Sequence, residues 1–136
     1  MKLLLDTHIL IWAAAGTLPL RAERLLMDEK NTLFFSSASI WEITIKLGLN
    51  RPDFQIDAEL LREGLLRNHY EELYVTSLHA LAAKHLPLLH KDPFDRILLA
   101  QAQCEGLTFL TADRIIKTYP GSIIFIKKDD DKNVKM

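Results

Sequence analysis

The sequence predicts a single α/β domain built around a doubly wound parallel sheet. Short apolar runs alternate along the 136 residues with longer segments of helical character, and this alternation is typical of β-α units in which the strands run parallel. The composition, 49% hydrophobic and 26% charged, is that of an ordinary folded domain. Neither an internal repeat nor a linker interrupts the pattern, so we expect residues 1–126 to form one domain.

Five short runs are expected to form the strands. They share a high content of Leu, Phe, Ile and Val, and they cover residues 2–5, 32–35, 73–75, 107–110 and 122–126. The first run holds three successive leucines, which suits a strand that helices cover on both faces.

Six longer segments have helical patterns. They cover residues 7–15, 19–29, 58–68, 78–85 and 93–105, together with a helix that begins among residues 36–39 and ends near residue 47. Asp57, Ser77 and Asp92 are the expected N-caps of the helices at residues 58–68, 78–85 and 93–105. Gly48 and Gly106 follow the ends of two helices, where glycine is favoured.

Charge, cysteine content and the N-terminus limit the possible partners and location. The 17 basic and 18 acidic residues give a net charge of -1, so a nucleic acid has to be held by a local patch. The single cysteine, Cys104, favours a reducing cytosol. Asp6 and His8 interrupt the apolar N-terminus, unlike a signal peptide, and no apolar run is long enough to span a membrane. We expect a cytoplasmic protein with a charged, flexible tail at residues 127–136.

Acidic residues fall where the predicted strands end or the next helices begin. Asp6 follows the first strand directly, Glu42 lies near the start of the helix after the second, and Asp113 lies just past the fourth. Asp95 lies in the first turn of the helix 93–105, one turn after Asp92. Because ligands bind beyond the carboxyl ends of parallel strands, we expect these acids to meet at one edge of the sheet.

A cation has to separate carboxylates that converge in this way, because like charges repel. Mg²⁺ prefers oxygen ligands and is often bridged to substrate phosphate. A metal held by carboxylates lowers the pKa of a bound water and stabilises the in-line cleavage of a phosphodiester. The residues therefore predict metal-dependent phosphodiester chemistry, with one or two ions.

Each acid except Asp6 also has a structural interpretation. Ser39 and Glu42 have the spacing of a capping box, Asp92 and Asp95 suit helix initiation, and Asp113 can cap a short turn. Asp6 differs because an unpaired carboxylate behind a buried strand costs several kcal/mol.

Histidines and tryptophans give weaker signals. His8 and His90 lie close in sequence to the acids and can contact a ligand, whereas the other three histidines are expected to be structural. Trp12 and Trp41 have apolar neighbours at helical spacing, so we expect them in the core.

Four motifs carry a resemblance to a known family. They span nearly the whole chain and are Leu3-Leu4-Leu5-Asp6-Thr7-His8, Ser39-x-Trp41-Glu42-Ile43-x-x-Lys46, His90-x-Asp92-Pro93-Phe94-Asp95-Arg96 and Leu110-Thr111-Ala112-Asp113-Arg114. In their order and spacing they resemble the PIN-domain family, specifically the ribonuclease toxins of VapC type.

The resemblance implies a three-layer α/β/α fold with a central parallel sheet, and Mg²⁺- or Mn²⁺-dependent cleavage of RNA. By position it implies a set of metal-site acids with two supporting hydroxyls: Asp6, Glu42, Asp95 and Asp113, with Asp92 as an additional acid, and Thr7 and Thr111. It also implies an antitoxin partner, a homodimer and a higher toxin–antitoxin assembly.

Three basic residues lie within one helical turn of a proposed acid: Lys46, Arg96 and Arg114. They are candidates for contacts with RNA phosphates. The alternative for each is an ordinary surface charge or a salt bridge to the neighbouring acid.

Two other functions compete with the nuclease. A non-catalytic PIN-like module would use the same surface to bind a protein. A phosphatase of the haloacid-dehalogenase type also starts with a strand and an Asp, but it needs a second Asp two residues later, where this chain has His8.

Overall fold

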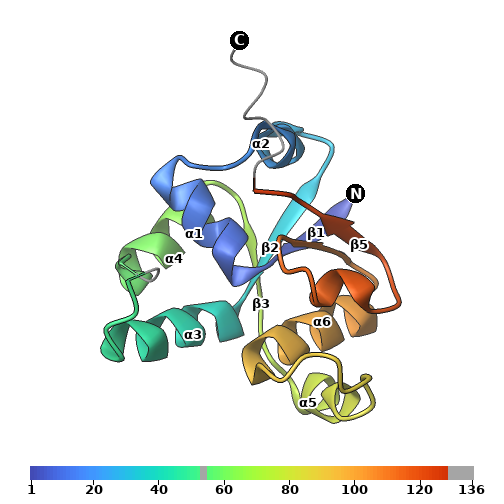
Figure 1. The fold of residues 1–136 in the computed structure, drawn as a ribbon. Coiled ribbons are helices and arrows are strands. Elements are labelled where there is room, and N and C mark those ends of the chain that lie inside the picture. The colour runs from blue at the N-terminus through green and yellow to red at the C-terminus, as the bar shows by residue number, and fades with distance from the viewer. Residues whose placement is uncertain (53–54, 129–136) are drawn as a thin grey trace.

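A five-stranded, all-parallel sheet lies at the centre of the protein (Figure 1). The computed structural model describes residues 1–52 and 55–128. In the order β3-β2-β1-β4-β5 across the sheet, the strands are β3 (Glu71–Leu73), β2 (Thr32–Ser36), β1 (Lys2–Leu5), β4 (Thr108–Thr111) and β5 (Ile123–Phe125). The predicted α/β class with a parallel sheet is confirmed.

Helices cover both faces of this sheet (Figure 1). They are α1 (Thr7–Ala15), α2 (Leu20–Met27), α3 (Ser37–Gly48), α4 (Ala58–Arg67), α5 (Ser77–Ala83), α6 (Pro93–Glu105) and the short 3₁₀ helix η1 (Ile116–Thr118). Side chains of α1, α2, α3 and α4 form the core on one face. Side chains of α5, α6 and η1 form the core on the other. The result is the expected three-layer α/β/α arrangement.

The alternation of side chains along β1 explains the two cores. Leu3 and Leu5 point into the core beneath α1 and α4, whereas Leu4 points into the core beneath α6. All three are fully buried. The run of leucines at the N-terminus is therefore the central strand of a sheet that is covered on both sides.

The order of the strands creates a switch point between β1 and β4. From β1 the chain moves outward to β2 and then β3, and it returns to the other side of β1 to form β4 and β5. Connections that diverge from two neighbouring parallel strands leave a crevice at their carboxyl ends, where ligands bind in such sheets. Asp6 follows one of these strands and Asp113 lies two residues beyond the other.

Three local expectations were wrong. β3 covers Glu71–Leu73 instead of residues 73–75, because its ends are set by pairing with β2, which places Phe34 opposite Glu71. The side chain of Thr76, not Ser77, caps α5 and forms a reciprocal capping box with His79. Trp41 is 62% exposed and lies outside the core.

Two further expectations concern membrane-spanning segments and the C-terminal tail. None of the helices formed by residues 1–52 and 55–128 has the length and apolarity that a bilayer span requires. Most of the predicted tail, residues 129–136, lies outside the described residues, and Lys127 and Lys128 are exposed.

Candidate metal centre

The carboxylate of Asp6 is buried at the candidate site, because the residue directly follows the central strand. Its residue is 3% exposed. Oδ2 accepts a hydrogen bond of 2.6 Å from the Thr111 hydroxyl at the end of β4. Oδ1 is buried and has no hydrogen-bond partner among the described residues. Burial raises the pKa of Asp6, opposed chiefly by the Thr111 hydrogen bond. The orphaned oxygen is an unsatisfied acceptor that a cation would complete.

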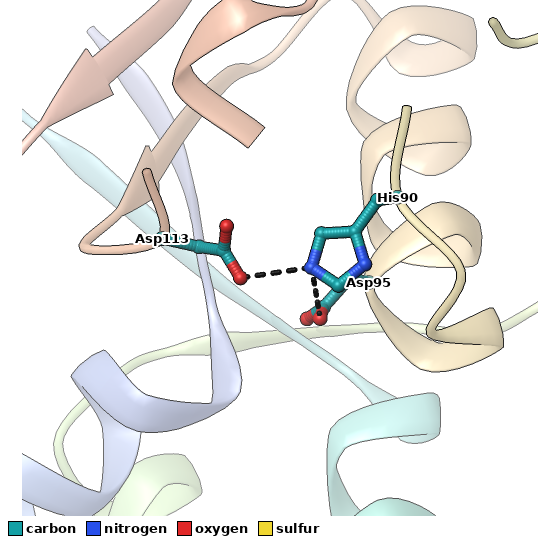
Figure 2. A group of neighbouring side chains, drawn as sticks. All are labelled: His90, Asp95 and Asp113. Carbon is teal, nitrogen blue, oxygen red and sulfur yellow. Dashed lines mark hydrogen bonds and ion pairs between the residues drawn. The ribbon is translucent and has the colours of Figure 1, made fainter. Parts of the chain in front are cut away.

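Asp95 and Asp113 lie beside His90, which comes from the loop before α6 (Figure 2). The imidazole Nε2 is 2.9 Å from Asp113 Oδ2 and 3.1 Å from Asp95 Oδ2. One ligand atom from each of the three residues lies within 4.8 Å of the other two. The fold thus brings side chains from α6, from the loop before it and from the segment after β4 to one point.

The two carboxyl groups differ in their acidity. Burial, and then repulsion from Asp6 and other acids, raises the pKa of Asp95 to about 9. Burial also raises the pKa of Asp113, but hydrogen bonds from His90 and from the backbone N–H groups of Ile116 and Ile115 outweigh it and lower the pKa overall. The Asp113 side chain therefore caps a short turn, as its structural interpretation predicted, while its other oxygen faces the site.

His90 is held in one orientation. Its Nδ1 accepts a hydrogen bond of 3.1 Å from the backbone N–H of Asp92, so in the neutral ring the proton is on Nε2, which donates toward the two carboxylates. His90 is a site residue that was singled out in the sequence only for its closeness to the acids. Its hydrogen bond to Asp113 joins residues 23 positions apart and depends on tertiary structure, so the motif alone does not show it.

Glu42 reaches the site from α3 and is held by two neighbours. Oε1 accepts a 2.6 Å hydrogen bond from the Thr7 hydroxyl, and Oε2 is 2.6 Å from Lys46 Nζ. The predicted capping box with Ser39 is not formed, because Ser36 caps α3 through the N–H of Ala38. Glu42 is therefore directed toward the site rather than back to its helix terminus.

Lys46 links Glu42 to Asp92, whose Oδ2 is 3.2 Å from Nζ. Asp92 Oδ1 caps α6 by accepting from the N–H of Phe94, as its structural interpretation predicted. Burial lowers the pKa of Lys46, but its contacts with Glu42 and Asp92 outweigh this and raise it. In the structure, Lys46 thus forms the salt bridge to neighbouring acids that was the alternative to a contact with RNA phosphate.

Arg96 and Arg114 differ in their surroundings. The Arg96 guanidinium donates to the backbone carbonyls of Ala83 at 2.7 Å and Pro87 at 2.9 Å. These contacts favour a structural role over the expected contact with RNA phosphate. Arg114 is exposed next to Asp113 and forms no ion pair with the residues that the structure describes.

The donor set fits the metal that the resemblance implies. Asp6, Asp95 and Asp113 offer carboxylate oxygens, which Mg²⁺ and Mn²⁺ prefer as ligands. The orphaned Asp6 oxygen and the raised pKa of Asp95 both mark a negative potential that a divalent cation would offset.

Fold and site together define an α/β domain with an acidic centre at the carboxyl edge of a parallel sheet. The profile of the PIN domain family matches residues 3–121, and the chain belongs to this family. No curated protein shows significant similarity to the chain.

Solved structures share the fold at low sequence identity. A chain of VapBC2 from Rickettsia felis, bound to a DNA fragment from its promoter, has a TM-score of 0.65 and 18% identity, covering 93% of this chain and 98% of that one. A chain of a toxin–antitoxin complex from Klebsiella pneumoniae has a TM-score of 0.62 and 20% identity, covering 89% and 94%. A chain of DNA-bound VapBC from Salmonella typhimurium has a TM-score of 0.65 and 18% identity, covering 92% and 98%.

Proposed function

We propose that this PIN domain is a Mg²⁺- or Mn²⁺-dependent endoribonuclease of VapC type that acts as the toxin of a toxin–antitoxin pair. The observation that carries the proposal is the buried Asp6 carboxylate, whose Oδ1 has no partner in the described chain. It lies close enough to Asp95 and Asp113 for the three charges to repel one another. Without a cation, the repulsion among these carboxylates costs free energy, and with one they can serve as metal ligands.

In this proposal Asp6, Asp95 and Asp113 hold the metal, with Glu42 and Asp92 at the border of the site. A bound divalent ion would supply positive charge to the scissile phosphate and lower the pKa of water, so that RNA phosphodiester bonds are hydrolysed. The protein needs no nucleophile of its own for this reaction.

The surrounding residues orient the acids. The Thr111 hydroxyl fixes Asp6 through Oδ2, and the His90 N–H fixes the Asp113 carboxylate. Thr7 fixes Glu42 in the same way. Arg114, exposed at the rim of the site, is available to contact an RNA phosphate.

The proposal includes partners and a location. Chains of similar fold occur in VapBC and toxin–antitoxin complexes, which supports an antitoxin for this chain. We propose a homodimer that joins a higher assembly with this antitoxin. Sedimentation of the purified protein tests the homodimer, and a monomer at all concentrations contradicts it. A cytoplasmic location agrees with the single exposed cysteine, Cys104.

One observation favours the alternative of a non-catalytic protein-binding module. Trp41, Val75, Phe94 and Ile97 border an apolar cavity of about 470 Å³ between α3 and α6. Trp41 and Val75 are exposed there, and an exposed apolar surface of this kind suits a protein contact. The two functions differ in whether the acids cleave RNA.

Cleavage of structured cellular RNA, with Mg²⁺ or Mn²⁺ against EDTA, tests the proposal. We expect discrete products that require both the metal and Asp6, so that Asp6→Asn is inactive. Asp28→Asn is the matched control, because Asp28 is exposed and precedes β2, whereas the site acids gather at the carboxyl ends of the strands. Cleavage that survives in purified Asp6→Asn contradicts the assigned site, and folded wild-type protein that neither cleaves RNA nor binds metal favours the binding module.

A further inference from the structure

The acids around the candidate site fall into two groups according to their contacts within the chain. In the first group every carboxylate oxygen has a partner. Glu42 uses one oxygen for Thr7 and the other for Lys46, and Asp92 uses one for the N–H of Phe94 and the other for Lys46. These four oxygens are satisfied without an ion.

The second group consists of Asp6, Asp95 and Asp113, and it lacks a cationic Lys or Arg partner in the described chain. Asp6 keeps one buried oxygen without a hydrogen bond. Among the described residues, Asp95 forms an ion pair with the His90 ring, which it shares with Asp113. Both oxygens of Asp113 have partners, the N–H groups of Ile115 and Ile116 and the His90 ring, but none of these is a lysine or an arginine. The three carboxylates therefore lack the full positive charge that Lys46 supplies to the first group.

We infer that the site takes one divalent ion, held by Asp6, Asp95 and Asp113, and that the Lys46 ammonium group occupies the place of a second ion between Glu42 and Asp92. The inference rests on the proposed metal site and refines it. Glu42 and Asp92 then serve to position Lys46 beside the ion and do not coordinate it.

The placement of Lys46 supports this division. Its side chain is only 14% exposed, and Nζ lies 2.6 Å from Glu42 and 3.2 Å from Asp92, so a single ammonium group bridges two carboxylates as a metal ion does. Glu42 and Lys46 are four residues apart on α3 in the favourable order. A second divalent ion would have to displace this partly buried ammonium group from both carboxylates and break its two ion pairs.

The number of ions is measured by titrating metal-free wild-type protein with Mn²⁺, with free Mn²⁺ counted by electron paramagnetic resonance and binding heat by calorimetry. Neither readout depends on RNA cleavage. We expect one Mn²⁺ per chain. Two ions per chain overturn the inference while leaving the proposed metal site intact, whereas no Mn²⁺ binding overturns the metal site itself.

Variants test the division of the acids. Asp6→Asn and Asp95→Asn are expected to weaken Mn²⁺ binding by about tenfold or more, and Asp92→Asn to leave it within about threefold. Lys46→Met removes the ammonium group and is expected to admit a second Mn²⁺. The control variant Lys84→Met, at an exposed lysine beyond the end of α5, is expected to bind one Mn²⁺ per chain, like wild type.

Two results from these variants overturn the inference. One is a folded Lys46→Met protein, verified by circular dichroism, that still binds a single Mn²⁺. The other is a loss of about tenfold or more in Mn²⁺ affinity in Asp92→Asn. If Lys46→Met does not fold, the Mn²⁺ affinity of Asp92→Asn decides whether Asp92 is a metal ligand. We expect this variant to fold, because Asp92 lies partly exposed at the start of α6.

Discussion

Thr111 connects two acids of the site through one hydroxyl group. It donates to Asp6 Oδ2 at 2.6 Å and accepts from the backbone N–H of Asp113 at 3.0 Å. Since the residue is fully buried, water cannot replace either bond. A single side chain therefore sets the separation between the end of β4 and the acid that follows β1.

Thr111→Val keeps the shape of the side chain and removes both hydrogen bonds. We expect the free energy of unfolding to fall by about 1–3 kcal/mol, because a buried carboxylate loses its donor. Urea unfolding of metal-free protein measures this. Thr44→Val is the control at an exposed threonine whose hydroxyl donates to its own helix backbone, and it is expected to change stability by less than about 0.5 kcal/mol. Equal stability of Thr111→Val and wild type contradicts the prediction.

Asp95 is expected to make the metal-free protein less stable as pH rises. Its pKa is raised to about 9 in the folded state, against an ordinary value near 3.8 in the unfolded chain, so the folded state binds the extra proton between these values. The free energy of unfolding then falls through this range by up to about 1.4 kcal/mol per pH unit. Asp113, whose pKa is lowered, acts in the opposite direction and only at lower pH.

Unfolding of wild type and Asp95→Asn in EDTA, at about pH 5.5 and about pH 8, measures this contribution. We expect wild type to lose stability over the interval and Asp95→Asn to lose clearly less. A parallel decline in both proteins would assign the pH dependence to other groups.

At the scale of elements, the loop between α5 and α6 carries His90 to the site and is fastened by Arg96. The guanidinium donates to the carbonyls of Ala83 and Pro87. The Tyr119 hydroxyl also donates to the Pro87 carbonyl and accepts from the N–H of His90. The loop is thus anchored to both α6 and η1.

Arg96→Met removes these donors while keeping much of the aliphatic stem. We expect a loss of about 2 kcal/mol in the free energy of unfolding, because the loop carbonyls lose charge-assisted hydrogen bonds. Thermal or urea unfolding provides the measurement. Arg67→Met, at an exposed arginine in the last turn of α4, should lie within about 0.5 kcal/mol of wild type. If the two variants are equally stable, the anchoring role of Arg96 is wrong.

Elements with strong local signals were predictable from the sequence. Three successive leucines indicated β1, and α6 begins at Pro93 behind its Asp92 cap and ends at Glu105, before Gly106, as expected. β3 was displaced because its bounds depend on pairing with β2. The places of Asp6 and Asp113 after strands were predictable because they depend on the local pattern. The contacts of Lys46 with Asp92 and of His90 with Asp113 were not, because they join residues 46 and 23 positions apart.

At the scale of the whole molecule, the proposed ion is expected to stabilise the fold. Binding to the folded state alone, at about 100 times the dissociation constant, adds about 2.7 kcal/mol, which corresponds to a rise of several degrees in Tm for a domain of this size. Differential scanning fluorimetry with Mn²⁺ and then excess EDTA measures the shift and its reversal. Asp6→Asn should show little shift, and a shift as large as that of wild type contradicts the role of Asp6.

The hydrogen bond between Thr111 and Asp6 joins residues 105 positions apart. The Asp6 carboxylate therefore leaves the ribosome long before the hydroxyl group that holds it. Contacts of such long sequence separation form late, since the intervening chain has to be ordered first. A growing chain that has not yet released β4 has no complete acidic centre, because Asp113 follows that strand.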